Sequence, residues 1–164
     1  MKLKAIIFAG WVCLMVGAVH AAEQRGDLIL KKIPIYEFED ARKLACTALY
    51  DVRYGRDVAD MREFPYFLCQ GRYEMTLMGE KGRAVTLYAQ FNYGKSNGFL
   101  VVRKRDDRPV WISDLENFAT GRWTTVQANH QTGGYEAFYR KGSGFDQNIS
   151  SLKWGSWWQG ETPK

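Results

Sequence analysis

Residues 83–105 read RAVTLYAQFNYGKSNGFLVVRKR, and this stretch decides the fold. Its two ends are rich in β-branched and aromatic side chains, which predicts strands at 83–91 and 98–105. The segment 92–97 between them contains glycine, serine and asparagine, the residues of a turn. Because a parallel connection needs a dozen residues or more, the two strands are expected to pair antiparallel.

The same alternation of strand-like runs and glycine turns extends through the rest of the chain from residue 66. It predicts further strands at 66–78, 109–115, 122–129, 134–140 and 148–154, with turns at 79–82, 106–108 and 132–134. Most links are short, so the expected architecture is an antiparallel β-sandwich or a Greek-key meander of about seven strands.

A different pattern precedes the strands. The segment 37–63 is predicted to be helical, because apolar or small side chains recur at helical spacing and acidic residues fill the first turn. The fold class is therefore α+β, mainly β, with one N-terminal amphipathic helix covering a face of the sheet. The apolar or small residues are Ala41, Leu44, Ala45, Ala48, Leu49 and Val52, and the acidic residues are Glu37, Glu39 and Asp40.

The N-terminal 21 residues have the pattern of a cleavable secretory signal: Lys2 and Lys4, an apolar run over 5–19, and Val-His-Ala at 19–21. The run is shorter than the roughly 20 residues that a membrane helix needs, so no membrane span is expected. We therefore expect residues 22–164 to form a single secreted domain, helical over 37–63 and strand-rich over 66–158. Its expected location is the periplasm or the extracellular medium.

Loss of this segment changes the inventory of reactive groups. The 23 basic residues fall to 21 against 18 acidic ones, which leaves a net charge of +3 instead of +5. Two cysteines remain, Cys46 and Cys69, and in an oxidising compartment they are expected to form a disulfide. His130 is the one remaining histidine, with no nucleophile motif and no set of zinc ligands around it. The sequence therefore predicts no catalytic residues, no metal site, no cofactor and no enzyme activity.

Nucleic acid is not an expected partner either, since the charge is low and the cations of 103–105 fit a solvated strand end. The aromatic content leaves two interpretations open. Trp154, Trp157 and Trp158 gather near the C-terminus, where they either close a β-sandwich core or stack on sugars. Core closure is the preferred interpretation.

The functional hypothesis depends on the segment 131–135, which reads Gln-Thr-Gly-Gly-Tyr and is followed by Arg140 and Lys141. Three stretches, 110–115, 123–126 and 132–138, resemble the periplasmic lysozyme inhibitors of bacteria, and in particular the group that acts on invertebrate-type lysozyme. The upstream stretch 85–88 also resembles a strand of that family. Members of that group present a Ser-Gly-x-Tyr loop after a strand that ends in Asp-Leu. A Thr-Gly-Gly turn is also common in hairpins of unrelated β proteins, and that interpretation stays open.

The resemblance implies an exported β-rich protein that binds and blocks a lysozyme-like muramidase, or a toxin of that kind in the manner of an immunity protein, through a hairpin loop. Thr132, Gly133, Gly134 and Tyr135 would enter the enzyme's cleft. Arg140 or Lys141 would pair with a catalytic carboxylate. The oligomeric state is left open.

A second resemblance is weaker. Gly134-Tyr135 followed by residues 146–152 is similar to the βγ-crystallin Greek key, which binds calcium through oxygen ligands. Gln147 stands where that motif has an acid or an asparagine. The alternative function is therefore a secreted ligand-binding module, for carbohydrate through tryptophan or for calcium through a degenerate site of this kind.

Overall fold

The computed structural model describes residues 27–35, 46–158, 160 and 162–163. The expected signal segment, 1–21, and residues 37–45 of the predicted helix lie outside them. Within the described part of the chain, no helix is long and apolar enough to cross a membrane.

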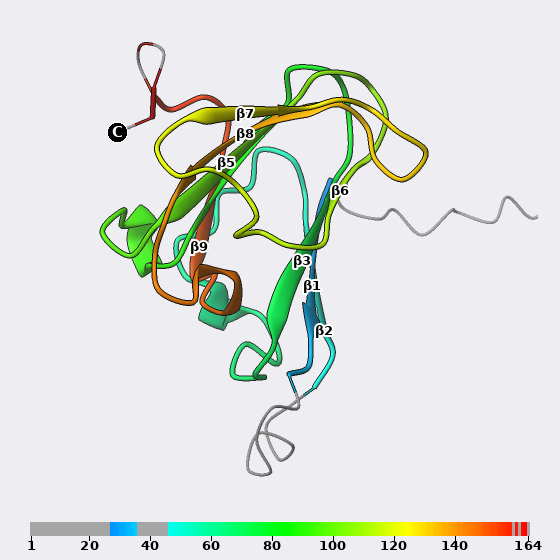
Figure 1. The fold of residues 1–164 in the computed structure, drawn as a ribbon. Helices are drawn as coiled ribbons and strands as arrows, with labels where there is room; N and C mark the ends of the chain where they lie inside the picture. Colours follow the sequence, from blue (N-terminus) through cyan, green and yellow to red (C-terminus); the bar gives the residue numbers. More distant parts are fainter. Residues whose placement is uncertain (1–26, 36–45, 159, 161, 164) are drawn as a thin grey trace, which may run out of the picture.

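The chain folds into two antiparallel β-sheets, shown in Figure 1. The four-stranded sheet has the order β2 (Ala48–Val52), β1 (Leu28–Ile33), β3 (Arg72–Leu77), β6 (Val110–Ile112). The five-stranded sheet has the order β7 (Trp123–Val126), β8 (Tyr135–Arg140), β5 (Phe99–Lys104), β4 (Ala84–Tyr88), β9 (Ser151–Trp154). Single 3-10 turns occur at Met61–Glu63, Phe91–Tyr93 and Phe145–Gln147.

All seven predicted strands are present, with bounds a few residues shorter than expected. The turns at 92–97 and 132–134 lie where β4 joins β5 and where β7 joins β8, and each of these pairs is hydrogen-bonded. The segments 79–82 and 106–108 instead carry the chain from one sheet to the other, because β3 and β6 belong to the four-stranded sheet. The mainly β, two-sheet architecture is confirmed.

The predicted helix is wrong over its described central part, because Ala48–Val52 forms strand β2. Ala48, Tyr50 and Val52 are buried, while Leu49 and Asp51 face solvent, which is the period-two pattern of a strand. Ala48 and Val52 are four residues apart, a spacing that puts two side chains on the same face both in a helix and in a strand. Pairing with β1 over the whole length of β2 decides between them.

One hydrophobic core fills the space between the sheets. It takes Leu30 and Met75 from the four-stranded sheet and Leu87 and Leu100 from the five-stranded one, all of them buried. The predicted disulfide is present: Cys46 lies just before β2 and Cys69 just before β3, with their Cα atoms 5.4 Å apart. These two strands flank β1, so the disulfide links the neighbours of β1 to each other.

A second aromatic cluster covers the outer face of the five-stranded sheet. Phe99 and Phe138 are buried there against Trp157, Trp158 and Trp123. The Trp157 indole N–H donates to Thr86 Oγ1 at 2.7 Å, which fixes the C-terminal segment on the sheet. Trp157 and Trp158 therefore pack on the outside of the sheet, whereas Trp154 belongs to the main core.

Candidate functional site

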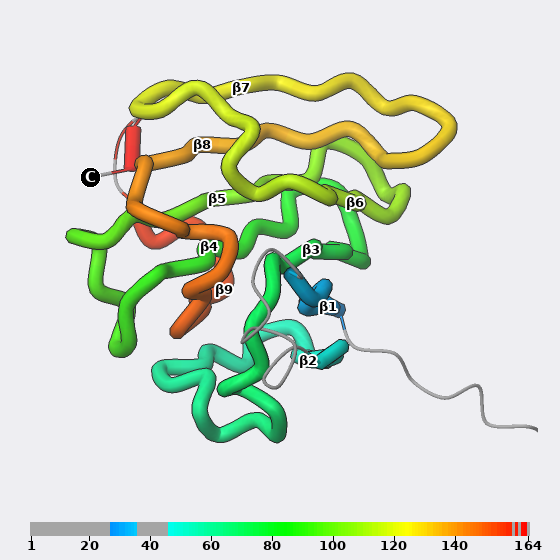
Figure 2. Tube along the Cα trace, turned by 60° about the horizontal axis from the view of Figure 1, so that its bottom comes forward, coloured from blue at the N-terminus to red at the C-terminus, as the bar shows by residue number. Residues whose placement is uncertain are grey.

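The loop between β7 and β8 is the most prominent projection of the described chain. In Figures 1 and 2 this hairpin extends past the ends of both sheets. Its tip, residues 127–131, is exposed throughout. Thr132, Gly133, Gly134 and Tyr135 follow the tip, and all four are buried. The predicted contact residues thus form the base of the loop, and the exposed residues precede them.

Thr132 is committed to contacts within the protein. Its Oγ1 accepts a hydrogen bond from the backbone N–H of Trp111 at 2.9 Å and donates to the carbonyl of Gly133 at 3.2 Å. Its side chain is 7% exposed. In this conformation the hydroxyl joins the loop to the edge of β6 and is not presented to another molecule.

The two glycines allow a close crossing of backbones. A Cβ atom on Gly133 would lie 2.6 Å from the Arg108 carbonyl oxygen, closer than real side chains come. The Gly133 N–H donates to Pro109 O, and the Gly134 N–H donates to Asp106 Oδ2, each at 2.7 Å. Glycine is needed here for proximity, since neither residue has a positive φ.

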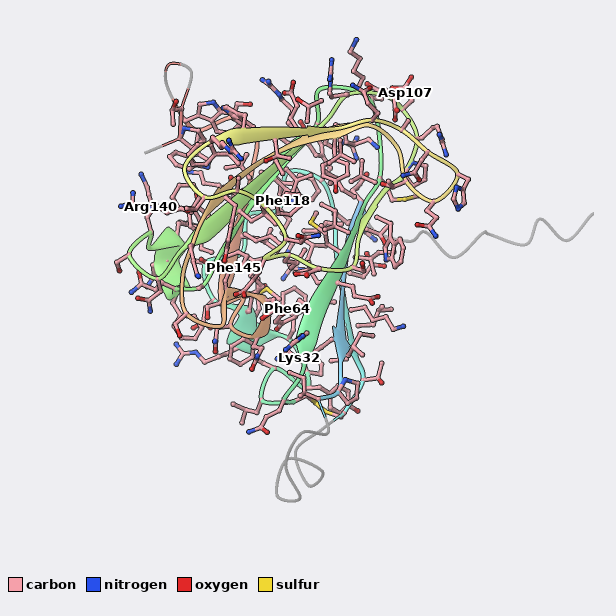
Figure 3. All side chains as sticks on the ribbon, viewed as in Figure 1. Lys32, Phe64, Asp107, Phe118, Arg140 and Phe145 are labelled. Carbon is pink, nitrogen blue, oxygen red and sulfur yellow. A yellow bond between two sulfur atoms is a disulfide. The ribbon has the colours of Figure 1, made fainter. Side chains whose placement is uncertain are left out.

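Tyr135 starts β8 and belongs to the main core, with its ring edge-on to Phe118 at 6.3 Å. Burial raises the pKa of its hydroxyl. Arg140 is at the other end of the same six-residue strand, about 17 Å away at the usual rise per residue. The prediction that Arg140 and Lys141 stand beside the loop is therefore wrong. Figure 3 shows Arg140 on the opposite side of the molecule from Asp107, which lies near the base of the loop.

Arg108 is a cation near the tip, and the imidazole of His130 lies in the tip itself; both residues are exposed. Arg108 Nη2 donates to the Asn129 carbonyl at 2.6 Å, and the Arg108 carbonyl accepts a hydrogen bond from the buried Lys104 Nζ. Asn129 Oδ1 in turn accepts from the N–H groups of Gln131 and Thr132, at 2.8 and 3.1 Å. The tip is thus held in one conformation by bonds to its own base.

Asp106 completes this support. Its carboxylate accepts backbone N–H bonds from Gly134 and Arg108, and these bonds lower the pKa of the carboxyl group. The ionised form therefore persists at neutral pH. The sequence around Asp106 is that of an ordinary turn, and nothing in it indicates that Asp106 holds a loop 28 residues away.

A groove of about 320 Å³ lies beside the hairpin, between the edge strands β6 and β7. Three of the four stretches that carry the lysozyme-inhibitor resemblance contribute to it: Trp111 to Asp114 from the first, Thr124 and Val126 from the second, Thr132 and Tyr135 from the third. The fourth stretch, 85–88, lies in β4 and does not line the groove. Asn117, Phe118 and Gln131 complete the lining. The fold therefore brings together three of the quoted motifs, which are up to 28 residues apart. No sequence motif marks Asn117 or the exposed ring of Trp111 as part of a site.

The proposed calcium ligands do not converge. Asp146 is 7% exposed, its carboxylate is 3.5 Å from Arg72 Nε, and burial followed by the charge of Glu116 raises its pKa. The Asn148 amide donates to the Gly144 carbonyl at 2.6 Å. Among the described residues, no three His, Cys, Asp or Glu side chains lie close enough together to hold a metal ion.

A larger cavity, of about 450 Å³, lies near the disulfide. It contains Lys32, which is 3% exposed and places its ammonium 2.7 Å from Cys69 O, 3.0 Å from Phe67 O and 4.6 Å from the centre of the Tyr73 ring. Burial lowers the pKa of this lysine to about 8.

No family model, curated protein or solved structure matches the chain.

Proposed function

We propose that this protein is a non-enzymatic, exported inhibitor or immunity-type protein that binds a lysozyme-like muramidase through the tip of the β7–β8 hairpin. The observation that carries the proposal is the tip itself, five exposed residues that project from a base fixed by hydrogen bonds. A loop already ordered in its binding conformation loses little entropy on association, which favours affinity.

The chemistry of the tip suits a glycosidase cleft. Such clefts carry a pair of carboxyl groups on either side of the scissile bond. Gln127, Asn129 and Gln131 supply amide groups, and His130 supplies an imidazole. Arg108 supplies a cation beside the tip. A cation that reaches a carboxylate in a cleft closed to water forms a charge-assisted hydrogen bond. The resemblance of the stretches 85–88, 110–115, 123–126 and 132–138 to bacterial lysozyme inhibitors supports the same target class.

The test is inhibition of a panel of muramidases that includes an invertebrate-type lysozyme. Purified protein is added in micromolar excess, and clearing of a cell-wall suspension is followed by turbidity. We expect inhibition of at least one enzyme. The double substitution Gln127→Ala with His130→Ala, which changes only exposed tip residues, should weaken it by at least about tenfold, as removal of contact residues at an interface centre does.

The matched control is Arg140→Ala with Lys141→Ala, at the far end of β8. This variant should inhibit as well as the unchanged protein. Full activity of every muramidase in the panel would contradict the proposal. If the tip variant inhibited as well as the unchanged protein, the hairpin tip would not be the contact surface.

A further inference from the structure

The groove between β6 and β7 holds the exposed tryptophan of the described chain. Trp111 is 39% exposed and lines the groove, whereas Trp123, Trp154, Trp157 and Trp158 are buried or packed on the aromatic clusters. Its position is fixed by pairing of its backbone with Thr76 in β3 and by its N–H bond to Thr132. A flat apolar ring is therefore presented to solvent from a rigid strand.

Polar side chains with unused hydrogen-bonding capacity surround this ring. Ser113, Asn117 and Gln131 are exposed and line the groove, and their side chains make no hydrogen bond to any other described residue. Each offers both a donor and an acceptor. Asp114 adds a carboxylate, of which Oδ1 accepts the Glu116 N–H at 3.0 Å.

The floor of the groove is apolar and belongs to the core. Phe118, Val126 and Tyr135 form it, and Tyr135 and Phe118 are in edge-on contact. An apolar floor under a rim of polar side chains suits a small molecule that has both an apolar face and polar groups. The volume of about 320 Å³ is at the lower end of the range for such sites.

These features together define the chemistry of a ligand. It needs an apolar face to lie on the Trp111 ring and hydroxyl groups at its edge, which can both donate to and accept from amides and hydroxyls. Asp114 is the charged residue that lines the groove, so a negative charge on the ligand is disfavoured. A pyranose ring has an apolar face of C–H groups and a rim of hydroxyls.

We infer that this groove binds a short neutral saccharide, with one ring stacked on Trp111 and its hydroxyls bonded by Ser113, Asn117 and Gln131. The saccharide site shares Gln131 with the muramidase contact proposed above, but Trp111, Ser113 and Asn117 lie outside the hairpin tip. Tyr135 and Thr132, which the sequence placed at the contact with an enzyme, here serve as the floor and the tether of the groove.

The experiment is calorimetric titration of the full protein with cellotriose, maltotriose and tri-N-acetylchitotriose, with digalacturonic acid as the anionic comparison and no muramidase present. We expect at least one neutral trisaccharide to bind with a Kd on the order of 1 mM or tighter, and the anion to bind at least tenfold more weakly. Trp111→Ala should weaken binding by more than tenfold. Asn117→Ala should weaken it severalfold.

Tyr66→Ala is the control, since Tyr66 is an exposed aromatic residue, at 71%, that does not line the groove. It should bind saccharide like the unchanged protein. Circular dichroism and the melting temperature check the fold of each variant, and Asn117→Ala keeps the test valid if Trp111→Ala does not fold. The inference is overturned if no neutral trisaccharide binds up to about 10 mM, if the anion binds as well, or if the groove variants bind normally.

The outcomes for the groove and for the hairpin tip are distinguishable. Saccharide binding is measured without an enzyme, and the tip variant keeps Trp111, Asn117 and Gln131. Inhibition of a muramidase without saccharide binding would support the proposed function and overturn this inference. Saccharide binding without inhibition of any muramidase would support this inference and contradict the proposed function.

Discussion

Two cavities of the described chain, the one near the disulfide and the groove beside the hairpin, differ in whether their polar side chains already make hydrogen bonds within the protein. The cavity near the disulfide is the larger, and it contains a buried ammonium group, that of Lys32. That ammonium already donates to two backbone carbonyls and lies over the Tyr73 ring. The groove beside the hairpin is smaller and carries no buried charge, yet the amides of Asn117 and Gln131 are unused in the described chain.

The larger volume of the cavity near the disulfide and the lowered pKa of Lys32 therefore do not by themselves indicate a binding site. A polar group whose hydrogen bonds are satisfied inside the protein stabilises the fold, and a ligand would have to displace those bonds. Uncommitted polar groups around a fixed aromatic ring can bind a ligand without such a loss. On this basis we assign Lys32 to structure and the groove beside Trp111 to binding.

The largest expected effect tests whether the groove floor is core. Tyr135→Ala should lower the free energy of unfolding by about 4 kcal/mol, because it removes a buried ring and leaves a cavity. Tyr135→Phe, which keeps the ring, should cost less than about 1 kcal/mol. Urea denaturation followed by circular dichroism measures both. A small effect of Tyr135→Ala would mean that Tyr135 is not part of the core and that the groove floor is mobile.

A second prediction sharpens the assignment of Lys32 to structure. Burial lowers its pKa to about 8 in the folded protein, against the 10.5 that is ordinary for lysine. Between these two pH values the unfolded chain binds more protons than the folded one, so stability due to this group rises with pH. Below pH 8 both states carry the proton, and the cost of burying the charge is fully present.

The quantity to measure is the unfolding free energy of the unchanged protein minus that of Lys32→Met. We expect this difference to rise by up to about 3 kcal/mol from pH 8 to pH 10.5. The comparison is made as a difference because Tyr73 and Tyr50, which lie close together and whose pKa values are raised by burial, also titrate in the alkaline range in the unfolded chain. These tyrosines are common to both proteins. A difference that is flat with pH would place Lys32 in contact with water.

The smallest of the three effects concerns the tether of the groove. Thr132→Val keeps the shape of the side chain but removes the acceptor for the Trp111 N–H, which should cost about 1–2 kcal/mol in unfolding free energy. Thr125→Val, on the exposed side of β7, is the matched control and should change stability by less than about 0.5 kcal/mol. Equal effects for the two variants would show that the Thr132 hydroxyl is not a tether.

The five-stranded sheet was predicted strand by strand because its hairpins are local and its strands consist of β-branched and aromatic residues. Half of the four-stranded sheet was missed. No strand was predicted at Leu28–Ile33, where the alternation is hidden because Lys32 faces inward and Ile33 is only half-buried. Ala48–Val52 was predicted as helix because its spacing fits both periods. Only pairing between segments distant in the sequence separates such cases.

The candidate site was predicted in part. The sequence pointed to the segment 131–135, and the structure places that segment at the base of the projecting loop and in the wall of the groove. Thr-Gly-Gly was taken for the tip of a turn, but Gly133 serves a backbone crossing with Arg108, a contact between segments that local sequence does not reveal. Arg140 and Lys141 were assigned to the site because they follow it closely in the sequence. Strand β8 lies between, and it carries Arg140 away from Tyr135.

The bonds from the loop to β6 also limit how copies of this protein can assemble. A strand at the rim of a sheet normally offers its outward N–H and carbonyl groups to a strand of another molecule. On β6 the Trp111 N–H and the neighbouring Pro109 carbonyl are already taken by Thr132 and Gly133. A strand of another molecule therefore cannot pair with β6 at these positions. The other edge strand of the four-stranded sheet is β2. Any oligomer formed by extending this sheet keeps Trp111 accessible in every subunit.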